Sequence, residues 1–488
     1  MNAQQPTERR TGRPGPYAVS RRHFLKQTAA GAAAALAGPL LTRSAPAILH
    51  KRPPNLLFLN VDQLRLSAIG RYGCQYAQTP HLDRLIQRGT SFRLSHSADP
   101  ICCPARAAWM TGRAPIENGV ASNNQALKLR AEMPDLGAWL RNAGYETFYV
   151  GKWHVTGREV SDSFTVLNEG HPAGEQGDWG VSRACEALLR NRPATKPLFL
   201  GVGLMNPHDI CQFGHPPQHV TYPQIETQLP PLPPNFAFDP REPEYFIANL
   251  RRSQYARTRT WTQDSWRMYA WTYYRYVEMI DAHIGRILDA LENSDYADNT
   301  LLVFSSDHGE AAGCHGLITK NYLYDEAVRV PMVVSFPGQV AANCLDEKNL
   351  VSGLDLAPTL CDYAGIAPPP DMRGLSLRPV LEARNAPRRD HVIAHSAIVG
   401  RMVRTARYKY IAYQGDKTDQ LFDMLSDPLE LRNVSAESAY AGTMADHRQM
   451  LADWEAQLKP APTPPGGWVE KAQRRKPQSK RKTATQSE

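Results

Sequence analysis

The sequence lacks the cysteine patterns that mark small metal-binding or redox domains. It has eight scattered cysteines with no Cys-x-x-Cys pair and no zinc spacing, at positions 74, 102, 103, 185, 211, 314, 344 and 361. It also lacks an apolar run of membrane-spanning length, because residues 29–41 supply about 13 residues where about 20 are needed. We therefore expect no structural zinc site and no stable membrane insertion.

The body of the chain lacks an excess of positive charge. The net charge is +8, but residues 1–47 carry seven Lys or Arg against one Glu, and residues 459–488 carry eight against two. Each end therefore contributes +6, which leaves −4 for the stretch between them. Because the basic residues belong to the two ends, we expect no nucleic-acid partner.

The N-terminus has the features of an export signal. Residues 20–26 read Ser-Arg-Arg-His-Phe-Leu-Lys and precede the apolar, Ala-rich run. Residues 45–47 (Ala-Pro-Ala) fit a small-residue cleavage site, and the paired arginines match the bacterial twin-arginine signal. We expect residues 1–47 to direct export by the twin-arginine translocase to the periplasm or beyond the cell. The alternative is an N-terminal membrane anchor.

Nearly continuous apolar runs predict buried strands of a parallel sheet. They cover residues 55–62, 146–150, 197–204 and 300–306, with a fifth run at 330–336. Between them, apolar residues at helical spacing predict helices over 81–88, 135–143 and 266–292. Strands that alternate with helices indicate an α/β fold with a mostly parallel sheet.

The first four runs are each followed by charged or metal-binding groups. These groups are Asp62, Lys152 with His154, His208, and Asp307 with His308. Open α/β sheets bind ligands beyond the carboxyl ends of their strands. A single acid at a strand end is often only a helix cap, but four strands that bring such groups to one edge indicate a site.

The C-terminal part predicts a smaller antiparallel sheet with one helix. Short β-like runs cover residues 391–396, 402–405, 408–413 and 420–423, followed by a helix over 445–458. We expect a large domain over residues 48–370, a C-terminal α/β subdomain over 371–459 and a disordered basic tail over 460–488. The proline-rich residues 215–243 predict a surface insertion that lines a cleft or only connects elements.

Residues 102–106 (Cys-Cys-Pro-Ala-Arg) form the most specific motif. They resemble the core of the sulfatase signature, in which a cysteine precedes a proline by two residues and an arginine by four. Cys102 has that spacing and Cys103 is the spacer. Taken alone, two adjacent cysteines near a proline are more often a buried apolar pair or disulfide partners.

Further motifs extend this resemblance from residue 55 to about 434. They lie at residues 151–154 (Gly-Lys-Trp-His), 320–331 and 420–430. The chain is identified as a member of the type I, formylglycine-dependent sulfatases of the alkaline phosphatase-like superfamily. The resemblance implies a large mixed sheet flanked by helices. It also implies oxidation of Cys102 to formylglycine by a formylglycine-generating or anaerobic sulfatase-maturing enzyme.

The modified residue has a chemical rationale. A serine that attacked a sulfate ester would become a sulfate ester that needs an equally hard second substitution. A hydrated aldehyde keeps a second hydroxyl, whose deprotonation re-forms the carbonyl and expels sulfate. Covalent catalysis then divides one hard step into two easier ones.

The resemblance also implies a divalent metal held by Asp62, Gln63, Asp307 and His308, with residue 102 facing it. Ca²⁺ is the usual ion of the family and suits oxygen ligands. Gln63 replaces a common Asp and His308 a common Asn, as in choline-sulfatase-like and phosphonate monoester hydrolase-like relatives. The change softens the site, so Mn²⁺ is the alternative ion. A structural amide and a core histidine are the other interpretations of these two residues.

Catalytic roles follow from the same resemblance. Lys152 and Lys320 would contact the sulfate oxygens as charge partners, and Arg106 would hold the diol. His154 would be the base that collapses the sulfated intermediate. His208 would bind the substrate and protonate the leaving alkoxide.

Three positions near the motifs carry less information. Asn123 follows Cys102 by 21 residues and is either a sulfate- or nucleophile-contacting side chain or a turn residue. His315 is given no role. Ala105 replaces a serine that is often found in the motif, which bears on recognition by the maturing enzyme.

We therefore expect a sulfuric-ester hydrolase that acts on a small-molecule or glycan sulfate ester, in particular a sulfated carbohydrate. A phosphonate or phosphate monoester hydrolase, or a choline-sulfatase-like enzyme, on the same scaffold is the alternative. The motif at residues 151–154 favours a sulfate ester as substrate, whereas Gln63 and His308 leave a phosphate or phosphonate ester as the alternative substrate. An unmodified binding protein without activity is the third hypothesis.

Overall fold

The computed structural model describes residues 52–213, 229–237, 239, 241–383, 389–396 and 399–462. By its contacts the chain divides into Met1–Pro46 and Ala47–Glu488, and every described residue belongs to the second unit. The predicted export signal lies outside the described residues, as do positions 463–488 of the predicted tail and 215–228 of the predicted insertion.

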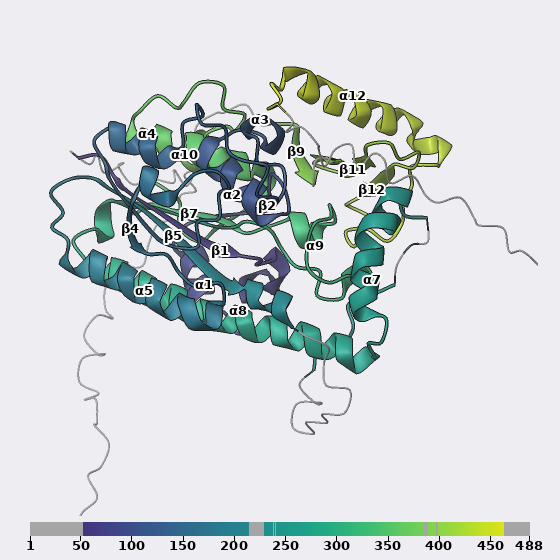
Figure 1. The fold of residues 1–488 in the computed structure, drawn as a ribbon, viewed down its shortest axis with the longest axis horizontal. Helices are drawn as coiled ribbons and strands as arrows, with labels where there is room; N and C mark the ends of the chain where they lie inside the picture. The colour runs from purple at the N-terminus through teal and green to yellow at the C-terminus, as the bar shows by residue number, and fades with distance from the viewer. Residues whose placement is uncertain are drawn as a thin grey trace, which may run out of the picture. The chain divides into compact units, whose positions relative to one another are not determined.

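An eight-stranded sheet runs through the centre of the described unit (Figure 1). Its strand order is β4-β3-β5-β1-β6-β7-β2-β8. The bounds are β1 Asn55–Asp62, β2 Thr90–His96, β3 Glu146–Gly151, β4 Thr165–Asn168, β5 Leu198–Pro207, β6 Thr300–Ser306, β7 Met332–Ser335 and β8 Cys344–Ser352. β7 pairs antiparallel with β6 and β2, and the other neighbouring pairs are parallel. The predicted mostly parallel α/β sheet is confirmed, but the run at 330–336 enters it in the opposite direction.

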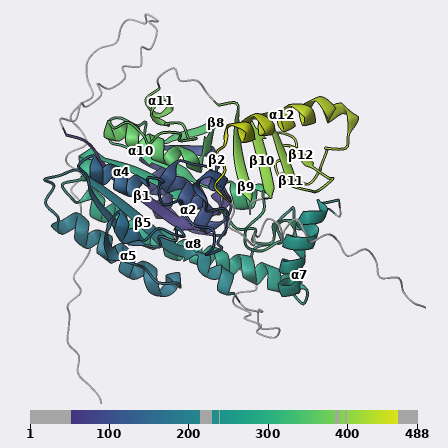
Figure 2. The ribbon, with the colours of Figure 1, turned by 45° about the horizontal axis from the view of Figure 1, so that its top comes forward.

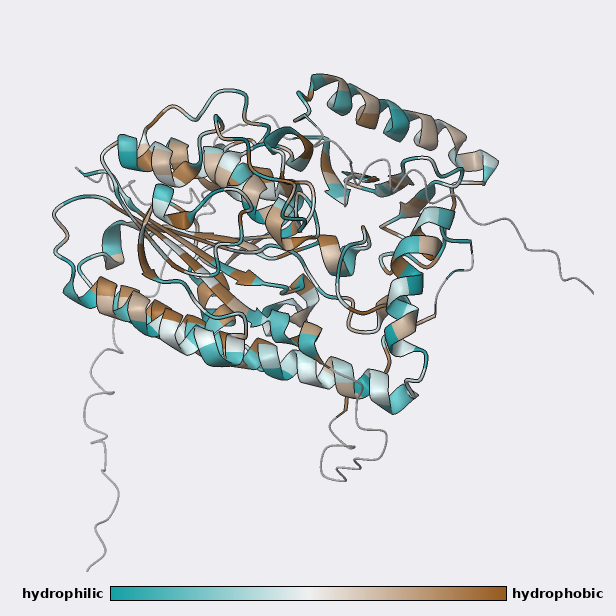
Figure 3. Ribbon diagram, in the orientation of Figure 1, coloured by the Kyte–Doolittle hydropathy of each residue, from teal (hydrophilic) through white to brown (hydrophobic). Residues whose placement is uncertain are grey.

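Alternate residues of β1 enter two different cores. Leu57 and Leu59 pack with α1 (Pro80–Gln87), α5 (Gly174–Asn191) and α8 (Gln263–Glu292) on one face. Leu56 and Phe58 pack with α2 (Cys102–Thr111), α4 (Leu136–Asn142) and α10 (Leu356–Ala364) on the other. A strand buried on both faces cannot alternate apolar with polar residues, which explains the continuous run. Figure 3 shows the resulting hydrophobic interior of the sheet.

The helices expected over 81–88, 135–143 and 266–292 are present as α1, α4 and α8. The other helices are α3 Pro115–Asn118, the π-helix η5 Phe246–Arg251, α7 Arg252–Thr258, α9 Asp325–Val328, α11 Arg378–Leu381 and α12 Ala441–Gln457. Short 3-10 turns are η1 Leu66–Ala68, η2 Gly70–Tyr72, η3 Val160–Asp162, η4 His208–Gln212, η6 Ala297–Asn299, η7 Cys314–Gly316, η8 Gly353–Asp355 and η9 Ser438–Tyr440. Within the described ranges, no helix is both long and apolar enough to cross a bilayer.

The predicted smaller antiparallel sheet is present with four strands, which lie in the order β12-β11-β10-β9 (Figure 2). Its strands are β9 His391–Ser396, β10 Gly400–Thr405, β11 Tyr408–Tyr413 and β12 Gln420–Asp423. One face packs against α12 through Val403, Leu421 and Met444. The other face packs through Met402 and Ile411 against the segment around α9.

A buried ion-pair network joins the second sheet to α9. The Nζ atom of Lys409, on β11, lies 2.8 Å from an oxygen of Asp325 and 2.8 Å from an oxygen of Glu430, and its side chain has no exposed surface. Arg329 also pairs with Asp325 at 3.0 Å. Burial opposes ionisation of Asp325, but Lys409 and then Arg329 lower the pKa of that carboxyl well below its ordinary value.

We predict that Lys409→Met will lower the free energy of unfolding by about 3–5 kcal/mol, because it leaves the buried carboxyl of Glu430 without its cation and Asp325 with Arg329 alone. Urea unfolding at neutral pH measures the loss. Arg432→Met, which removes the partner of Glu437 from an exposed pair, should change stability by no more than about 1 kcal/mol. Equal effects of the two substitutions would contradict this account of the network.

Buried His96 generates a prediction about acid sensitivity. Its Nδ1 lies 3.0 Å from the Leu94 carbonyl oxygen, and burial lowers its pKa to about 3. The unfolded chain therefore binds one more proton than the folded chain between that pH and the ordinary histidine pKa of about 6.5. Stability from this group is present above about pH 6.5 and is lost as the pH falls, by about 1.4 kcal/mol per pH unit.

The variant His96→Asn keeps an amide nitrogen near the Nδ1 position but cannot take up the proton. Urea unfolding at pH 7, 6 and 5 should show a shallower loss of stability in the variant than in the wild type. Parallel pH curves for the two proteins would show that His96 does not titrate on unfolding.

Candidate active site

The site lies at the carboxyl ends of four neighbouring parallel strands. β3, β5, β1 and β6 are adjacent in the sheet and bring Lys152, His208, Asp62 and Asp307 to one edge. Asp62 ends β1 beside Pro207 of β5, and Val61 pairs with Ser306 of β6. The expectation that these strand ends share one edge is therefore confirmed by the sheet order, although the residues come from segments up to 245 positions apart.

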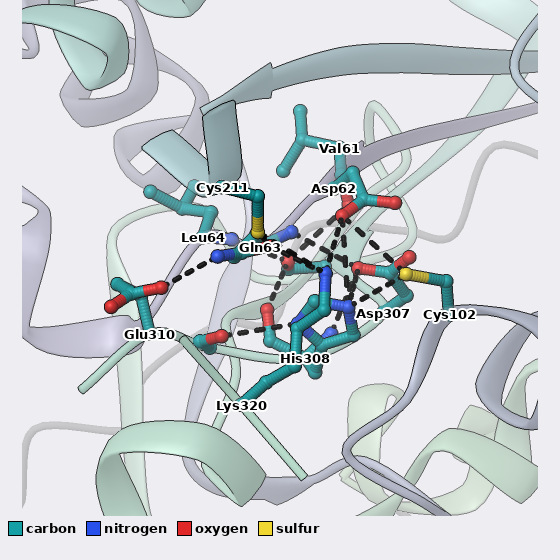
Figure 4. Close-up of polar contacts among 12 residues, drawn as sticks. Val61, Asp62, Gln63, Leu64, Cys102, Cys211, Asp307, His308, Glu310 and Lys320 are labelled. Carbon is teal, nitrogen blue, oxygen red and sulfur yellow. Dashed lines mark hydrogen bonds and ion pairs between the residues drawn. The ribbon is translucent and has the colours of Figure 1, made fainter. Parts of the chain in front are cut away.

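Cys102 faces these strand ends from the first turn of α2. Ile101, which precedes it, is extended, and every residue of α2 is buried. The thiol lies 3.1 Å from Nε2 of His308 and 3.8 Å from Oδ1 of Asp62 (Figure 4). Burial and Asp62 oppose ionisation, but Lys320 and Lys152 lower the pKa of the Cys102 thiol well below its usual value.

Four side chains converge as potential metal ligands. Single ligand atoms of Asp62, Cys102, Asp307 and His308 all lie within 4.8 Å of one another, and all four residues are buried. Nε2 of His308 is 3.6 Å from a carboxylate oxygen of each aspartate. Such spacings suit atoms that each lie about 2.3–2.6 Å from a shared ion. The donor set and its geometry therefore fit a divalent cation.

Gln63 borders this cluster in a strained backbone conformation. Its φ of 72° is left-handed, which is uncommon for a residue with a side chain. The backbone N–H donates to Oδ1 of Asp307 at 3.1 Å, and the side-chain oxygen Oε1 accepts from Nζ of Lys320 at 2.6 Å. Its amide oxygen therefore shares the Lys320 ammonium with Asp62, whose Oδ1 lies 4.0 Å from the same Nζ.

Arg106 connects the two aspartates. Its Nε donates to Asp307 at 2.9 Å, and its Nη2 lies 3.4 Å from Asp62. Nη1 donates to the side chain of Asn60 at 3.0 Å and to the carbonyl oxygen of Lys152 at 2.9 Å. The guanidinium is almost wholly buried, so its charge is compensated by these carboxylates rather than by water. In this structure Arg106 holds the strand ends, one helical turn from Cys102.

Two lysines complete the electropositive edge. Nζ of Lys152 forms an ion pair with Asp62, and Nζ of Lys320 lies 4.0 Å from the same carboxylate. Burial opposes ionisation of Asp62, but Lys152, His208 and Lys320 hold its pKa well below the usual range. Both ammonium groups therefore lie where they could contact an anion bound in front of residue 102.

The two predicted acid–base histidines also lie at this edge. Hydrogen bonds to the thiols of Cys102 and Cys103 outweigh burial and raise the pKa of His154 to about 9. His154 has a left-handed φ of 53°, which turns the chain sharply after β3. His208 is close enough to Asp62 to lower its pKa, and its buried Nδ1 has no hydrogen-bond partner among the described residues.

Asn123 reaches the same helix from the following loop. Its side-chain oxygen accepts from the backbone N–H of Cys103 at 2.9 Å. That N–H is one of the groups at a helix start that have no partner within the helix. The observed contact is thus with the helix that carries residue 102.

Three residues to which the sequence analysis gave no role, Glu310, Cys211 and His315, make specific contacts in the structure. Glu310 and Cys211 both bond to the side chain of Gln63. His315 stacks on Tyr324 with ring centroids 4.0 Å apart and lies 3.7 Å from Glu326. Glu310 could have been noticed three residues after Asp307, but no local pattern connects Cys211 to the site.

The site thus combines a buried thiol, a carboxylate–imidazole cluster and two lysines, a set that suits an enzyme acting on anionic esters. Comparison with known proteins identifies the class. The sulfatase family model matches residues 54–366, and the model of the C-terminal part of N-sulphoglucosamine sulphohydrolase matches residues 313–457. The chain belongs to the sulfatase family and is a sulfuric-ester hydrolase, which confirms the interpretation of the motifs.

Individual relatives cover most of the chain. A Δ4,5-hexuronate-2-O-sulfatase of Bacteroides thetaiotaomicron is 31% identical over 435 residues, which are 83% of this chain and 89% of that protein. A solved 2-O GAG sulfatase is 29% identical with a TM-score of 0.74, over 85% of this chain and 96% of its own. A phosphonate monoester hydrolase of Agrobacterium radiobacter, 23% identical with a TM-score of 0.71 over 83% and 96%, shares the fold.

We predict that Arg106→Lys will lower the free energy of unfolding by about 2–3 kcal/mol. Lysine keeps the charge, but a single ammonium cannot reproduce the guanidinium contacts with two aspartates and a carbonyl. Urea unfolding in the presence of a chelator measures the loss without a bound metal. Arg190→Lys on the exposed part of α5 is the matched control and should leave stability nearly unchanged. A variant as stable as the control would remove Arg106 from this structural role.

Proposed function

We propose that this sulfatase uses a formylglycine at position 102 and a divalent metal to remove sulfate from a sulfated carbohydrate. One observation carries the proposal. Position 102 lies on a buried helix start, within 4 Å of both Asp62 and His308. The two lysines Lys152 and Lys320 stand at the same carboxylate. That arrangement gives a nucleophile, ligands for a cation and two charge partners for an anionic ester in one enclosed site.

Asp62, Gln63, Asp307 and His308 would hold the metal, with residue 102 facing it. Three oxygen donors favour a hard cation, so we propose Ca²⁺, with Mn²⁺ as the alternative because of the imidazole. When bound, the ion polarises a sulfate oxygen and favours the ionised form of the nucleophile.

The chain's own residues would divide the reaction into two steps. One hydroxyl of a hydrated aldehyde at position 102, after losing its proton to solvent, would attack sulfur, while His208 would protonate the alcohol oxygen as the sulfur–oxygen bond of the ester breaks. His154, which would no longer face the Cys102 thiol that contributes to its raised pKa, would then take the proton of the second hydroxyl. The carbonyl re-forms, sulfate leaves, and water hydrates the aldehyde again. Lys152 and Lys320 bind the sulfate oxygens throughout, and Asn123 and Arg106 support the helix start that carries residue 102.

The choice of a carbohydrate rests on the relatives. The relative that is 31% identical is named a hexuronate-2-O-sulfatase, and the solved structure at 29% identity is described as a 2-O GAG sulfatase. A second candidate is a phosphonate or phosphate monoester, because a protein of this fold is named a phosphonate monoester hydrolase. Sulfate and phosphate esters are both tetrahedral oxyanions, so the fold does not separate them.

We further propose that residues 1–47 export the protein through the twin-arginine translocase to the periplasm or beyond the cell. The support is the paired arginines at 21 and 22, followed by a short apolar run and a small-residue site. Cargo of this route folds before export. A formylglycine-generating or anaerobic sulfatase-maturing enzyme would therefore act on Cys102 in the cytosol, while the stretch around it is still accessible.

The test uses enzyme produced together with a maturing enzyme. The tryptic peptide of residues 94–106 should show the lower mass of formylglycine, and the enzyme should desulfate a 2-O-sulfated uronate disaccharide. Cys102→Ala should lower the rate at least about a thousandfold because it removes the nucleophile. Cys103→Ala, the adjacent control, should retain the rate within about tenfold.

Sulfated uronates, 6-O-sulfated N-acetylglucosamine, aryl sulfates and aryl phosphate or phosphonate esters are compared in the same assay. Turnover of phosphorus esters without turnover of sulfate esters would reverse the order of the two candidates. A peptide that carries only unmodified cysteine in an active enzyme would exclude the formylglycine mechanism.

A further inference from the structure

Glu310 is a buried carboxylate with an unusually complete set of donors. It lies on the loop after β6, two residues after His308, and has no exposed surface. Oε1 accepts from the hydroxyl of Tyr269 at 2.9 Å and from the backbone N–H groups of Ala312 at 3.0 Å and Thr319 at 2.7 Å. Oε2 accepts from Nε2 of Gln63 at 2.5 Å. The two backbone N–H groups can only donate, so this carboxyl acts as an acceptor.

The opposite end of the Gln63 amide also meets a group of fixed polarity. Its Oε1 accepts from Nζ of Lys320 at 2.6 Å and from the thiol of Cys211 at 3.2 Å. An ammonium group donates and cannot accept. If the amide were turned over, its oxygen would face the Glu310 carboxylate and its nitrogen would face the ammonium. Both contacts would then be repulsive, so the two neighbours permit one orientation (Figure 4).

The backbone of Gln63 is held as firmly as its side chain. Its N–H donates to Asp307, and its carbonyl accepts from the hydroxyl of Tyr273 at 2.9 Å. Burial, and then the charge of Glu310, raise the pKa of the neighbouring Tyr269 well above its ordinary value, so that hydroxyl remains a donor. The backbone of Gln63 and both ends of its amide are therefore held by hydrogen bonds.

We propose that Glu310 is a positioning residue that makes Gln63 an oxygen ligand of the cation. The inference rests on the metal site of the proposed function and deepens it. It also accounts for the residue type at position 63, where a carboxylate would face the Glu310 carboxylate at hydrogen-bonding distance. Glu310 would not contact the cation itself. Its carboxylate accepts from the amide nitrogen of Gln63 and thereby fixes the direction of the amide oxygen.

The test measures Ca²⁺ affinity by calorimetry, and the Ca²⁺-dependent rise in melting temperature, independently of turnover. Glu310→Gln should weaken Ca²⁺ binding by about 10–100-fold, because the amide of Gln63 loses the partner that fixes it. Gln63→Glu alone should weaken binding similarly, because it opposes two carboxylates. The reciprocal double variant Gln63→Glu with Glu310→Gln restores a carboxylate–amide pair and should bind within about tenfold of the wild type.

Asp281→Asn is the matched control. Asp281 is also a buried carboxylate that accepts two backbone N–H groups, from His81 at 3.1 Å and Leu82 at 2.7 Å, but it lies on α8 away from the cluster. Its loss should lower stability in chelator and leave Ca²⁺ affinity unchanged. A merely structural role of Glu310 would produce the same pattern as this control.

The outcomes separate the inference from the proposed function. Unchanged Ca²⁺ affinity in Glu310→Gln overturns the inference alone. If that variant does not fold, the double variant decides: binding near the wild-type level supports the inference, and loss of binding overturns it. Wild-type protein that binds neither Ca²⁺ nor Mn²⁺ overturns both. Wild-type protein that binds Ca²⁺ with the expected variant pattern, yet cleaves no sulfate ester, overturns only the proposed function.

Discussion

The whole site depends on the burial of two like charges at adjacent strand ends. Asp62 and Asp307 have no exposed surface and would repel each other if no cation separated them. Arg106 contacts both carboxylates and also binds Asn60 and the Lys152 carbonyl. A planar guanidinium can make these contacts at once because its donors point in different directions. One side chain of α2 therefore fixes β1, β3 and β6 relative to position 102.

The charges around this centre explain which ligands it suits. Lys152 and Lys320 join Arg106, so three cationic side chains surround two carboxylates. Adding a divalent cation makes the enclosed region strongly positive, which favours an ester that carries negative charge. Membership of the sulfatase family makes a sulfate the first candidate for this ester. The surrounding helices bury the helix start at position 102, so these charges act with little screening by water.

The side chain of Gln63, a proposed metal ligand, is held in place by residues that lie behind it. The amide of Gln63 connects the Lys320 ammonium to the Glu310 carboxylate, which three further donors hold. Replacement of a common acid by glutamine at position 63 therefore does not delete a charge from the region. The Glu310 carboxylate lies next to this side chain, and the left-handed backbone of Gln63 places the amide between Glu310 and Lys320.

The sequence by itself determined the central strands, α8, the second sheet and the site residues that directly follow strands. Burial on both faces of the central strands requires apolar runs, and Asp62, Lys152, His208 and Asp307 stand at the ends of four such runs. The strands β2, β4 and β8 were not predicted, because their mixed burial leaves no clear period. Helix α5 was not predicted because glycine, aspartate and serine occupy much of its buried face, so its helical period is not apolar. The direction of β7 could not be read either, since a short apolar run is the same in both directions.

Only the tertiary structure decided which side chains meet across the site. The contacts of Arg106 with Asp307, of Glu310 with Gln63 and of Cys211 with Gln63 join residues separated by 201, 247 and 148 positions. Hydrogen bonds of this kind depend on distance and orientation in space, and local propensity carries no information about them. The sequence thus determined which groups are available for chemistry, and the packing of α2 and the β6 loop onto the strand ends decided how they act together.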